Sequence, residues 1–473
     1  MVDGRALTAQ FEDAADFETR KVLCGGQLLT VLFLDGLTSG RDIAEQVLRP
    51  LAQMTDEARE EVLYTRALQG GVWCASVKEP ESTQQAAELL VNGFCVILFP
   101  KSGKALGCEV KTGEKRSPSP PETENTVKGA KDAFTETLRT NTSLVRRHLR
   151  TPGLRLTETV IGKRTLTKVT VCWIDRLTDP ELPRRMQERL SSIDIDGALS
   201  PAAIEEYVTG SRRTAFPLLE YTERTDHFCQ GLLDGQVGLL ADGLPLGYLA
   251  PVGLGRLMRS PEDRATDFFS ASMLRLLRYA ALGVSLLLPA LYAAMAMFHQ
   301  QMLPTKLLLS IIESKQNVPF STLLEVLGLL CAFELLQQAG LHLPQAVGTA
   351  VSIIGGLVVG TAAVDAKLVS PAALIVTASS GICGFTLPNR ELSDAVRLWR
   401  FVLTVLAGLW GLFGVTVGLL LLLTDLAGLE SLGRSYLSPF GRAEVKGALV
   451  RPRLVRQKWR DGALKPMDDQ NQR

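Results

Sequence analysis

YAALGVSLLLPALYAAMAMF, residues 279–298, is a charge-free segment that divides the chain into two unlike halves. Three further charge-free segments of similar length follow, at 344–364, 368–389 and 401–424. A helix of about 20 apolar residues matches the hydrocarbon thickness of a bilayer, where the backbone has to satisfy its own hydrogen bonds. We therefore predict an all-α polytopic membrane domain over 263–433, with these four segments as its spans.

The region before this domain is soluble in character and contains an internal duplication. Residues 30–38, TVLFLDGLT, align with residues 170–178, TVCWIDRLT. In each copy an apolar run is followed by a polar turn and a helical pattern, which indicates a strand covered on both faces. These repeats predict an α/β fold of two related subdomains, over 1–116 and 159–262. A linker and a basic helical segment, 117–158, would join them.

Segment 319–340 has the length of a spanning helix but carries two carboxylates, Glu325 and Glu334. Charged groups in hydrocarbon are costly, and at about 100° per residue these two lie on opposite faces of a helix. The two carboxylates therefore cannot face one pore together. We predict that 319–340 is an interfacial or protein-buried helix and does not cross the membrane.

Charge flanking the apolar segments sets the expected topology. Arg264, Arg275 and Arg278 precede or begin the first span, and the tail over 434–473 is rich in Lys and Arg. By the positive-inside rule, both the soluble region and the tail are predicted to be cytoplasmic. The basic tail is open to two interpretations, attraction to anionic lipid headgroups or an ordinary cytoplasmic flank. Equal sidedness requires an even number of crossings, so if 319–340 crosses, another span must be re-entrant.

The predicted span at 344–364 contains a seam of small residues, one at every fourth position: Gly348, Ser352, Gly356 and Gly360. Such a seam lets two helix backbones approach closely. It fits contact with the following span, contact with a neighbouring protomer, or the narrow wall of a pore. If these helices line a pathway, selectivity would come from charge, for which Asp365, Glu334 and Glu325 are the candidates.

Enzyme chemistry is not indicated. The sequence has no Walker loop, GxSxG, HExxH or GxGxxG in a strand–turn–helix context. Asp194-Ile195-Asp196 resembles a metal-binding DxD, but a surface turn explains it better. The eight cysteines have no CxxC spacing and there are only four histidines, so reduced thiols are expected instead of a disulfide framework or zinc site. We predict no catalytic residue, cofactor or metal, and the net charge of +1 gives no sign of a nucleic-acid partner.

Residues 128–147, KGAKDAFTETLRTNTSLVRR, closely resemble the signature stretch of the GerA spore-germination family, A-subunit type. SSIDIDGALS at 191–200, RSPED at 259–263 and SYLSPF at 435–440 follow in that family's order. Ala130, Ala133 and His148 depart from its usual residues. The signature residues are Lys128, Gly129, Phe134, Glu136, Arg139, Asn141, Arg146 and Arg147.

This resemblance implies a membrane subunit of a germinant receptor in the spore inner membrane, with the soluble region and tail on the core side. It further implies a ring-shaped homo-oligomer that couples nutrient sensing to ion release, together with a transporter-like B subunit and a lipoprotein C subunit. The sibling SpoVAF group has the same architecture. The alternative function is a non-conducting assembly scaffold of the germination or dipicolinate-release machinery; a secondary transporter would require inverted repeats among the spans.

Overall fold

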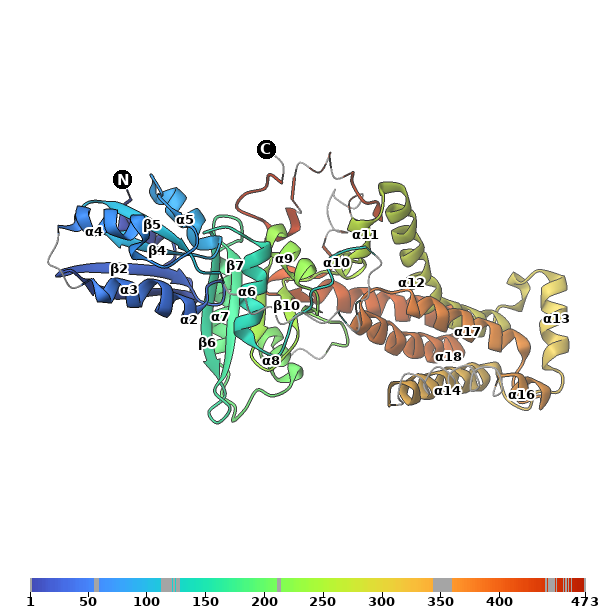
Figure 1. Ribbon diagram of the computed structural model, residues 1–473. Helices are drawn as coiled ribbons and strands as arrows, with labels where there is room; N and C mark the ends of the chain where they lie inside the picture. Colours follow the sequence, from blue (N-terminus) through green and yellow to red (C-terminus); the bar gives the residue numbers. More distant parts are fainter. Residues whose placement is uncertain are drawn as a thin grey trace.

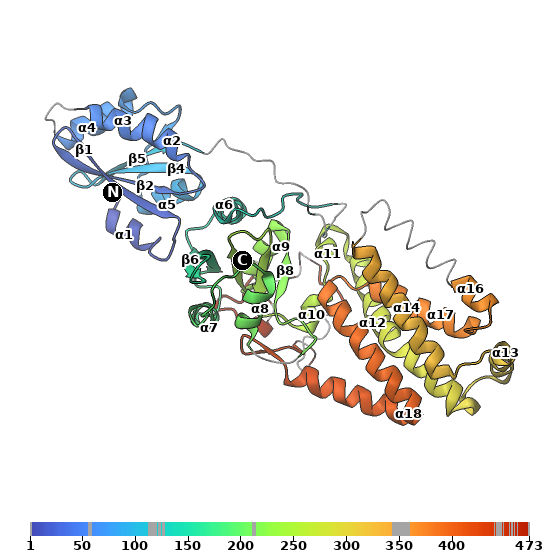
Figure 2. The same cartoon turned by 90° about the horizontal axis from the view of Figure 1, so that it is seen from below.

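The computed structural model describes residues 2–54, 59–111, 121, 124, 128–210, 214–342, 360–438 and 440, and in the tail residues 447, 449–453, 455, 457, 459–460 and 462–471. Figure 1 shows two sheet-containing lobes at one end of an elongated chain and a helical bundle at the other. The same order holds in the view turned by 90° (Figure 2). The first lobe, the second lobe and the bundle thus follow one another in space as they do in the sequence.

The first lobe, subdomain 1, is built on an antiparallel sheet with the strand order β1-β2-β4-β5-β3. Its strands are β1 (Phe17–Cys24), β2 (Gln27–Leu34), β3 (Val77–Lys78), β4 (Phe94–Phe99) and β5 (Lys104–Glu109). Its helices are α1 (Gly4–Ala9), α2 (Gly40–Asp42), α3 (Arg49–Gln53), α4 (Glu60–Arg66) and α5 (Thr83–Val91), with the wider helical turns η1 (Ile43–Leu48) and η2 (Ala67–Gly71).

The second lobe, subdomain 2, has an antiparallel sheet with the order β6-β7-β9-β10-β8. Its strands are β6 (Leu154–Ile161), β7 (Thr167–Ile174), β8 (Glu220–Thr222), β9 (Val237–Ala241) and β10 (Gly247–Ala250). Its helices are α6 (Leu138–His148), α7 (Glu181–Ser191), α8 (Pro201–Thr209), α9 (Thr225–Asp234), α10 (Leu254–Leu257) and α11 (Glu262–Ala265).

The two sheets confirm the duplication, because the five strands of each occur in the same spatial order. The repeated strands β2 and β7 each pair on both sides and bury both faces. Val31 enters one apolar core of subdomain 1, whereas the adjacent Leu32 enters the other. Val171 and Cys172 divide in the same way between the two cores of subdomain 2. Alternation along a pleated strand sends neighbouring side chains to opposite faces, so an uninterrupted apolar run needs cover on both.

The helical region confirms the expected fold class, and its axis continues away from subdomain 2 (Figure 1). Its helices are α12 (Phe268–Met297), η3 (Gln300–Met302), α13 (Thr305–Lys315), α14 (Thr322–His342), α16 (Gly360–Asp365), α17 (Pro371–Phe385) and α18 (Arg390–Gly428). The strands β11 (Glu430–Ser431) and β12 (Arg434–Ser435) and the turn η6 (Gly462–Leu464) follow. The long helix α12 packs against both α17 and α18.

The predicted span over 401–424 lies within α18, which is a helical hairpin instead of one straight helix. Gly411 has φ 62° and ψ −142°, outside the helical region. Figure 2 shows α18 folding back on itself. After the reversal Gly418 lies against the Leu403 side chain, and a Cβ on Gly414 would collide with the Leu406 carbonyl oxygen. Only glycine adopts such a backbone at low cost, and the glycines after it let the two arms approach. The hairpin therefore begins and ends at the same end of the bundle.

Within the described residues, three helices are long and apolar enough to cross a membrane, namely Phe268–Met297, Thr322–Ala339 and Arg390–Gly428. The second lies in the segment for which we predicted an interfacial or buried helix; its length and composition also permit a crossing. Helix α17 has 15 residues and is shorter than the predicted span over 368–389. The predicted span over 344–364 lies mostly outside the described residues.

Candidate functional site

The signature segment forms the joint between the two subdomains. Arg146 on α6 is only 1% exposed, and its Nε and Nη2 donate to the two carboxylate oxygens of Asp16, each at 2.7 Å. Its Nη1 donates to the Leu154 carbonyl at 3.2 Å. Asp16, 2% exposed, precedes β1 of subdomain 1, whereas Leu154 begins β6 of subdomain 2. One buried guanidinium therefore ties both lobes to α6.

Other signature residues reinforce this joint. Arg139 pairs with Asp35 at the end of β2 and with Glu158 on β6, both at 3.1 Å. The Asn141 side chain accepts from the Thr135 amide at 2.8 Å and donates to its carbonyl at 2.6 Å, which fixes the turn before α6. Phe134 packs edge-to-face on Phe228 of α9, with ring centroids 5.3 Å apart. By contrast, Lys128, Gly129, Glu136 and Arg147 are exposed.

A histidine–carboxylate pair lies at the end of α6. His148 Nε2 and Asp132 Oδ2 are 2.7 Å apart, and Thr225 Oγ1 donates to the same oxygen at 2.6 Å. The hydrogen bond from His148 lowers the pKa of Asp132 to about 2, and that from Thr225 adds to the effect. The same bond raises the pKa of His148. This hydrogen-bonded group therefore holds the start of α9 against the signature segment.

The junction between subdomain 2 and the bundle is dense in ion pairs. Arg256 on α10 donates to Glu220 at 2.6 Å and to Asp234 at 3.0 Å, and Arg264 reaches Asp234 at 3.1 Å. Burial by itself raises the pKa of Glu220, but the charges of Arg256 and His227 outweigh it and lower this pKa to about 2. These side chains are therefore charged at neutral pH.

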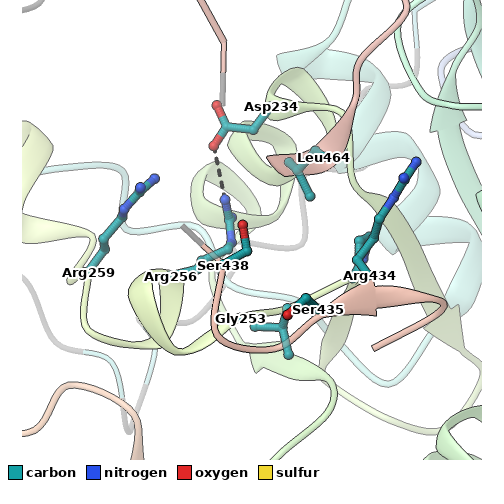
Figure 3. A pocket seen from close by; sticks show the side chains of 10 residues that line it. Asp234, Gly253, Arg256, Arg259, Arg434, Ser435, Ser438 and Leu464 are labelled. Carbon is teal, nitrogen blue, oxygen red and sulfur yellow. Dashed lines mark hydrogen bonds and ion pairs between the residues drawn. The ribbon is translucent and has the colours of Figure 1, made fainter. Parts of the chain in front are cut away.

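A small pocket opens beside these ion pairs (Figure 3). Its volume is about 40 Å³, enough for a few water molecules. In the close-up, Arg259 and Arg434 lie on either side of the Asp234–Arg256 pair. Arg434, from β12, also pairs with Asp179 of subdomain 2. The tail adds Leu464 to the wall of the pocket, so three parts of the chain meet there.

Both ends of the apolar helices are fastened to subdomain 2 at this junction. Asp263, after α10, pairs with Arg275 at 3.2 Å and Arg278 at 2.8 Å on the first turns of α12. After α18, Ser431 Oγ donates to the Leu218 carbonyl at 2.6 Å and accepts from the Val252 amide at 3.0 Å. Movement of subdomain 2 relative to the bundle therefore has to move α12, α18 or both.

A charged cluster lies in the middle of the bundle. Arg400 on α18 is 1% exposed, and its Nη1 donates to Ser380 Oγ on α17 at 3.2 Å. Ser380 in turn donates to the Ser285 carbonyl on α12 at 2.7 Å. One turn earlier, Arg397 pairs with Glu334 on α14 at 2.8 Å. Within the described residues the Nε and Nη2 atoms of Arg400 and one oxygen of Glu334 have no hydrogen-bond partner.

We call these residues the mid-bundle cluster: Ser285, Glu334, Ser380, Arg397 and Arg400. The cluster was only partly predictable from the sequence. Glu334 was a candidate pathway charge, whereas the two arginines were missed because they precede the charge-free window that starts at residue 401. Their spacing of three residues directly before an apolar run was the available signal. Buried ionisable groups at this depth are costly, which makes them the strongest functional candidates in the bundle.

The remaining predicted residues lie elsewhere. Glu325 is buried in the first turn of α14, where it accepts from the Ser370 amide and lies 3.4 Å from Lys315 Nζ. Asp365 is exposed at the end of α16, and Gly360 begins that helix. Gly348, Ser352 and Gly356 are outside the described residues. The DxD carboxylates pair with lysine and arginine, Asp194 with Lys163 at 2.5 Å and Asp196 with Arg164 at 3.3 Å. No His/Cys/Asp/Glu group suited to a metal occurs in the part of the chain that the structure describes.

Comparison with known proteins gives consistent matches. Residues 5–466 match the family model of the Bacillus/Clostridium GerA spore germination protein. The uncharacterized membrane protein YfkQ of Bacillus subtilis (strain 168) is 36% identical over 450 residues, covering 94% of this chain and 87% of that protein. Spore germination protein KA of the same strain is 34% identical over 448 residues, covering 93% and 81%.

Spore germination protein GerLA of Bacillus cereus is 32% identical over 433 residues, covering 91% of this chain and 88% of that protein. Among solved structures, the N-terminal domain of the A subunit of the Bacillus megaterium spore germinant receptor GerK3 aligns at a TM-score of 0.41 and 23% identity. That alignment covers 52% of this chain and 92% of the solved chain.

Proposed function

The chain belongs to the GerA spore germination protein family, and from this premise we propose that it is a membrane subunit of a spore germinant receptor. In this proposal a ring-shaped oligomer of the chain couples nutrient sensing to ion release across the spore inner membrane. The soluble lobes and the tail face the core. A transporter-like B subunit and a lipoprotein C subunit complete the receptor, and the nutrient binds outside this chain, which has no enzymatic role.

The observation that carries the proposal is the attachment of α18 at the junction. Ser431 and the strands that follow α18 are bound into subdomain 2, and the first arm of the same hairpin carries Arg397 and Arg400 into the bundle. The opposing carboxylate, Glu334, is on α14, which packs on α17 and α18. A displacement of subdomain 2 is thereby converted into a displacement of charge inside the bundle.

In the resting state we propose that the mid-bundle cluster opposes cation passage electrostatically. Arg397 is paired with Glu334, but the buried guanidinium of Arg400 makes no ion pair and its hydrogen-bond partner within the described residues is the neutral Ser380. At an effective dielectric constant of about 20, two unit charges about 8 Å apart repel by about 2 kcal/mol. This repulsion lowers the occupancy of a cation at that distance from Arg400 roughly thirtyfold. Separation of Arg400 from the pathway during activation would remove this barrier.

The test is cation flux through the purified full chain reconstituted in liposomes. Arg400→Gln should raise basal cation flux roughly tenfold or more, whereas Arg400→Lys, which keeps the charge, should stay near the wild-type level. Absence of flux from the wild type and from Arg400→Gln, together with stable complexes with the B and C subunits, would refute conduction by this chain. That result would instead support the scaffold function.

A further inference from the structure

Three cysteines of subdomain 1 lie on neighbouring stretches of backbone. Cys95 on β4 is directly opposite Cys108 on β5 in the antiparallel ladder. Cys74 precedes β3, whose residue Val77 pairs with Cys108 from the other side. The Ser76 carbonyl accepts from the Glu109 amide at 3.0 Å, which holds the segment carrying Cys74 beside β5. The topology thus brings together residues more than 30 positions apart in the sequence.

Cys74 also packs against the apolar core of subdomain 1 that contains Cys95 and Cys108, and its thiol interacts with that of Cys108. The Cys74 thiol lies 4.0 Å from the Gln46 carbonyl oxygen as well. The interaction with Cys108 lowers the pKa of Cys74, whereas the same interaction and burial raise the pKa of Cys108. Cys74 is therefore the member of the pair that loses its proton first.

The two thiols differ in access as well as in acidity. Cys108 and Cys95 are fully buried, but Cys74 is only partly buried and follows Trp73, which is 57% exposed. A partly exposed cysteine whose pKa is lowered, with a second thiol packed behind it, is the arrangement in which thiol–disulfide exchange proceeds. Cys24, by contrast, is buried, and burial raises its pKa.

We propose that Cys74 and Cys108 form a redox-reactive dithiol that low-molecular-weight disulfides oxidise to an intramolecular disulfide, with Cys74 as the attacking thiol and Cys108 as the resolving thiol. In the first step the Cys74 thiolate attacks one sulfur of the small disulfide. A mixed disulfide forms and one small thiolate leaves. In the second step the sulfur of Cys108 attacks Cys74 and the second small thiolate leaves, taking up the Cys108 proton.

Overall, one small disulfide is reduced to two small thiols, and the two protein thiols are oxidised to one disulfide. The new bond would close the loop that contains α5 and β4 and would fasten the chain beside β3 to β5. Because β3 is a two-residue edge strand paired only with β5 in its sheet, this is where the sheet has the fewest ladder bonds. Oxidation should therefore raise the thermal unfolding midpoint of subdomain 1. The inference does not depend on the proposed ion-release function.

Peptide mapping tests the proposal, because trypsin separates the three cysteines. Cys74 lies in peptide 67–78, Cys95 in peptide 79–101 and Cys108 in peptide 105–111. We would treat the purified full chain in detergent with oxidised glutathione, block remaining thiols and digest. The expected product is peptide 67–78 joined to peptide 105–111, lighter by two hydrogens than the pair and cleaved by dithiothreitol.

Variants assign the two roles. In Cys108→Ser the reaction should stop with glutathione on peptide 67–78, and in Cys74→Ser peptide 105–111 should stay unmodified. Cys331→Ser, which removes an exposed thiol of α14, serves as the matched control and should leave the product unchanged. A wild-type chain that links 67–78 to 79–101, or that forms no intramolecular link, overturns the proposal whether or not the variants fold.

Discussion

Replacing Arg146 by methionine should be among the most damaging substitutions in the soluble lobes. The guanidinium and the Asp16 carboxylate are both almost fully buried and share two hydrogen bonds of 2.7 Å. Arg146→Met leaves the carboxylate desolvated and unpaired and also removes the contact with the Leu154 carbonyl. Breaking a buried pair in this way costs about 3–5 kcal/mol. For a soluble part of about 260 residues, this corresponds to a fall of roughly 6–20 °C in the unfolding midpoint.

The assay is thermal unfolding of the full chain in detergent, followed by tryptophan fluorescence. Trp73 reports on subdomain 1 and Trp173 on subdomain 2. Arg147→Met changes the neighbouring exposed arginine and should shift the midpoint by about 1 °C or less. The double variant Asp16→Leu/Arg146→Met should recover most of the loss, because an apolar pair can replace a buried ion pair. If the single variant stays within 1 °C of the wild type, or if the double variant is no better than the single, the reasoning about the joint is refuted.

Gly411→Ala should destabilise the α18 hairpin by about 1–3 kcal/mol, because alanine resists a positive φ. Gly428→Ala should be neutral, because a Cβ added there has open space within 4 Å. Equal melting of the two variants would count against the hairpin. Exchanging His148 for glutamine should cost most stability between about pH 4 and pH 6.5. Because folding raises the pKa of His148, its contribution to folding stability is lost as pH rises through that pKa. Because folding lowers the pKa of Asp132, its contribution to folding stability is lost as pH falls toward 2. A difference in unfolding midpoint that is flat from pH 4 to pH 9 would contradict this. Arg400→Met should leave the thermal unfolding midpoint unchanged or raise it, since an apolar side chain can replace a buried guanidinium whose hydrogen bonds are incomplete. A fall of more than about 5 °C in that midpoint would show instead that the arginine stabilises the fold.

The duplicated sheets could be predicted because a strand buried on both faces has a local signature in the sequence, a continuous apolar run. The break in α18 could not be predicted. Gly408, Gly411, Gly414 and Gly418 look alike in one apolar run, and only packing decides which of them takes the positive φ. Likewise, nothing local pairs Arg146 with Asp16, which lie 130 residues apart. Sequence patterns report periodicity and burial, whereas the pairing of buried charges depends on the tertiary fold.

The distribution of charge in the bundle argues for two discrete states over gradual opening. Arg397 and Arg400 are on the hairpin that subdomain 2 holds at its base, whereas Glu334 is on a neighbouring helix. A small slide between the two helices would stretch the Arg397–Glu334 bond of 2.8 Å. Arg397 would keep its pair with Asp394 on its own helix, whereas Glu334 would lose its arginine, and an unpaired carboxylate inside the bundle is expensive. Intermediate positions of the hairpin relative to α14 are therefore higher in free energy than the paired resting state. They are also higher than a displaced state in which water or another group takes over the pairing. For the proposed function, this predicts that the bundle switches only when displacement of the soluble lobes supplies enough free energy to cross the barrier between the two states.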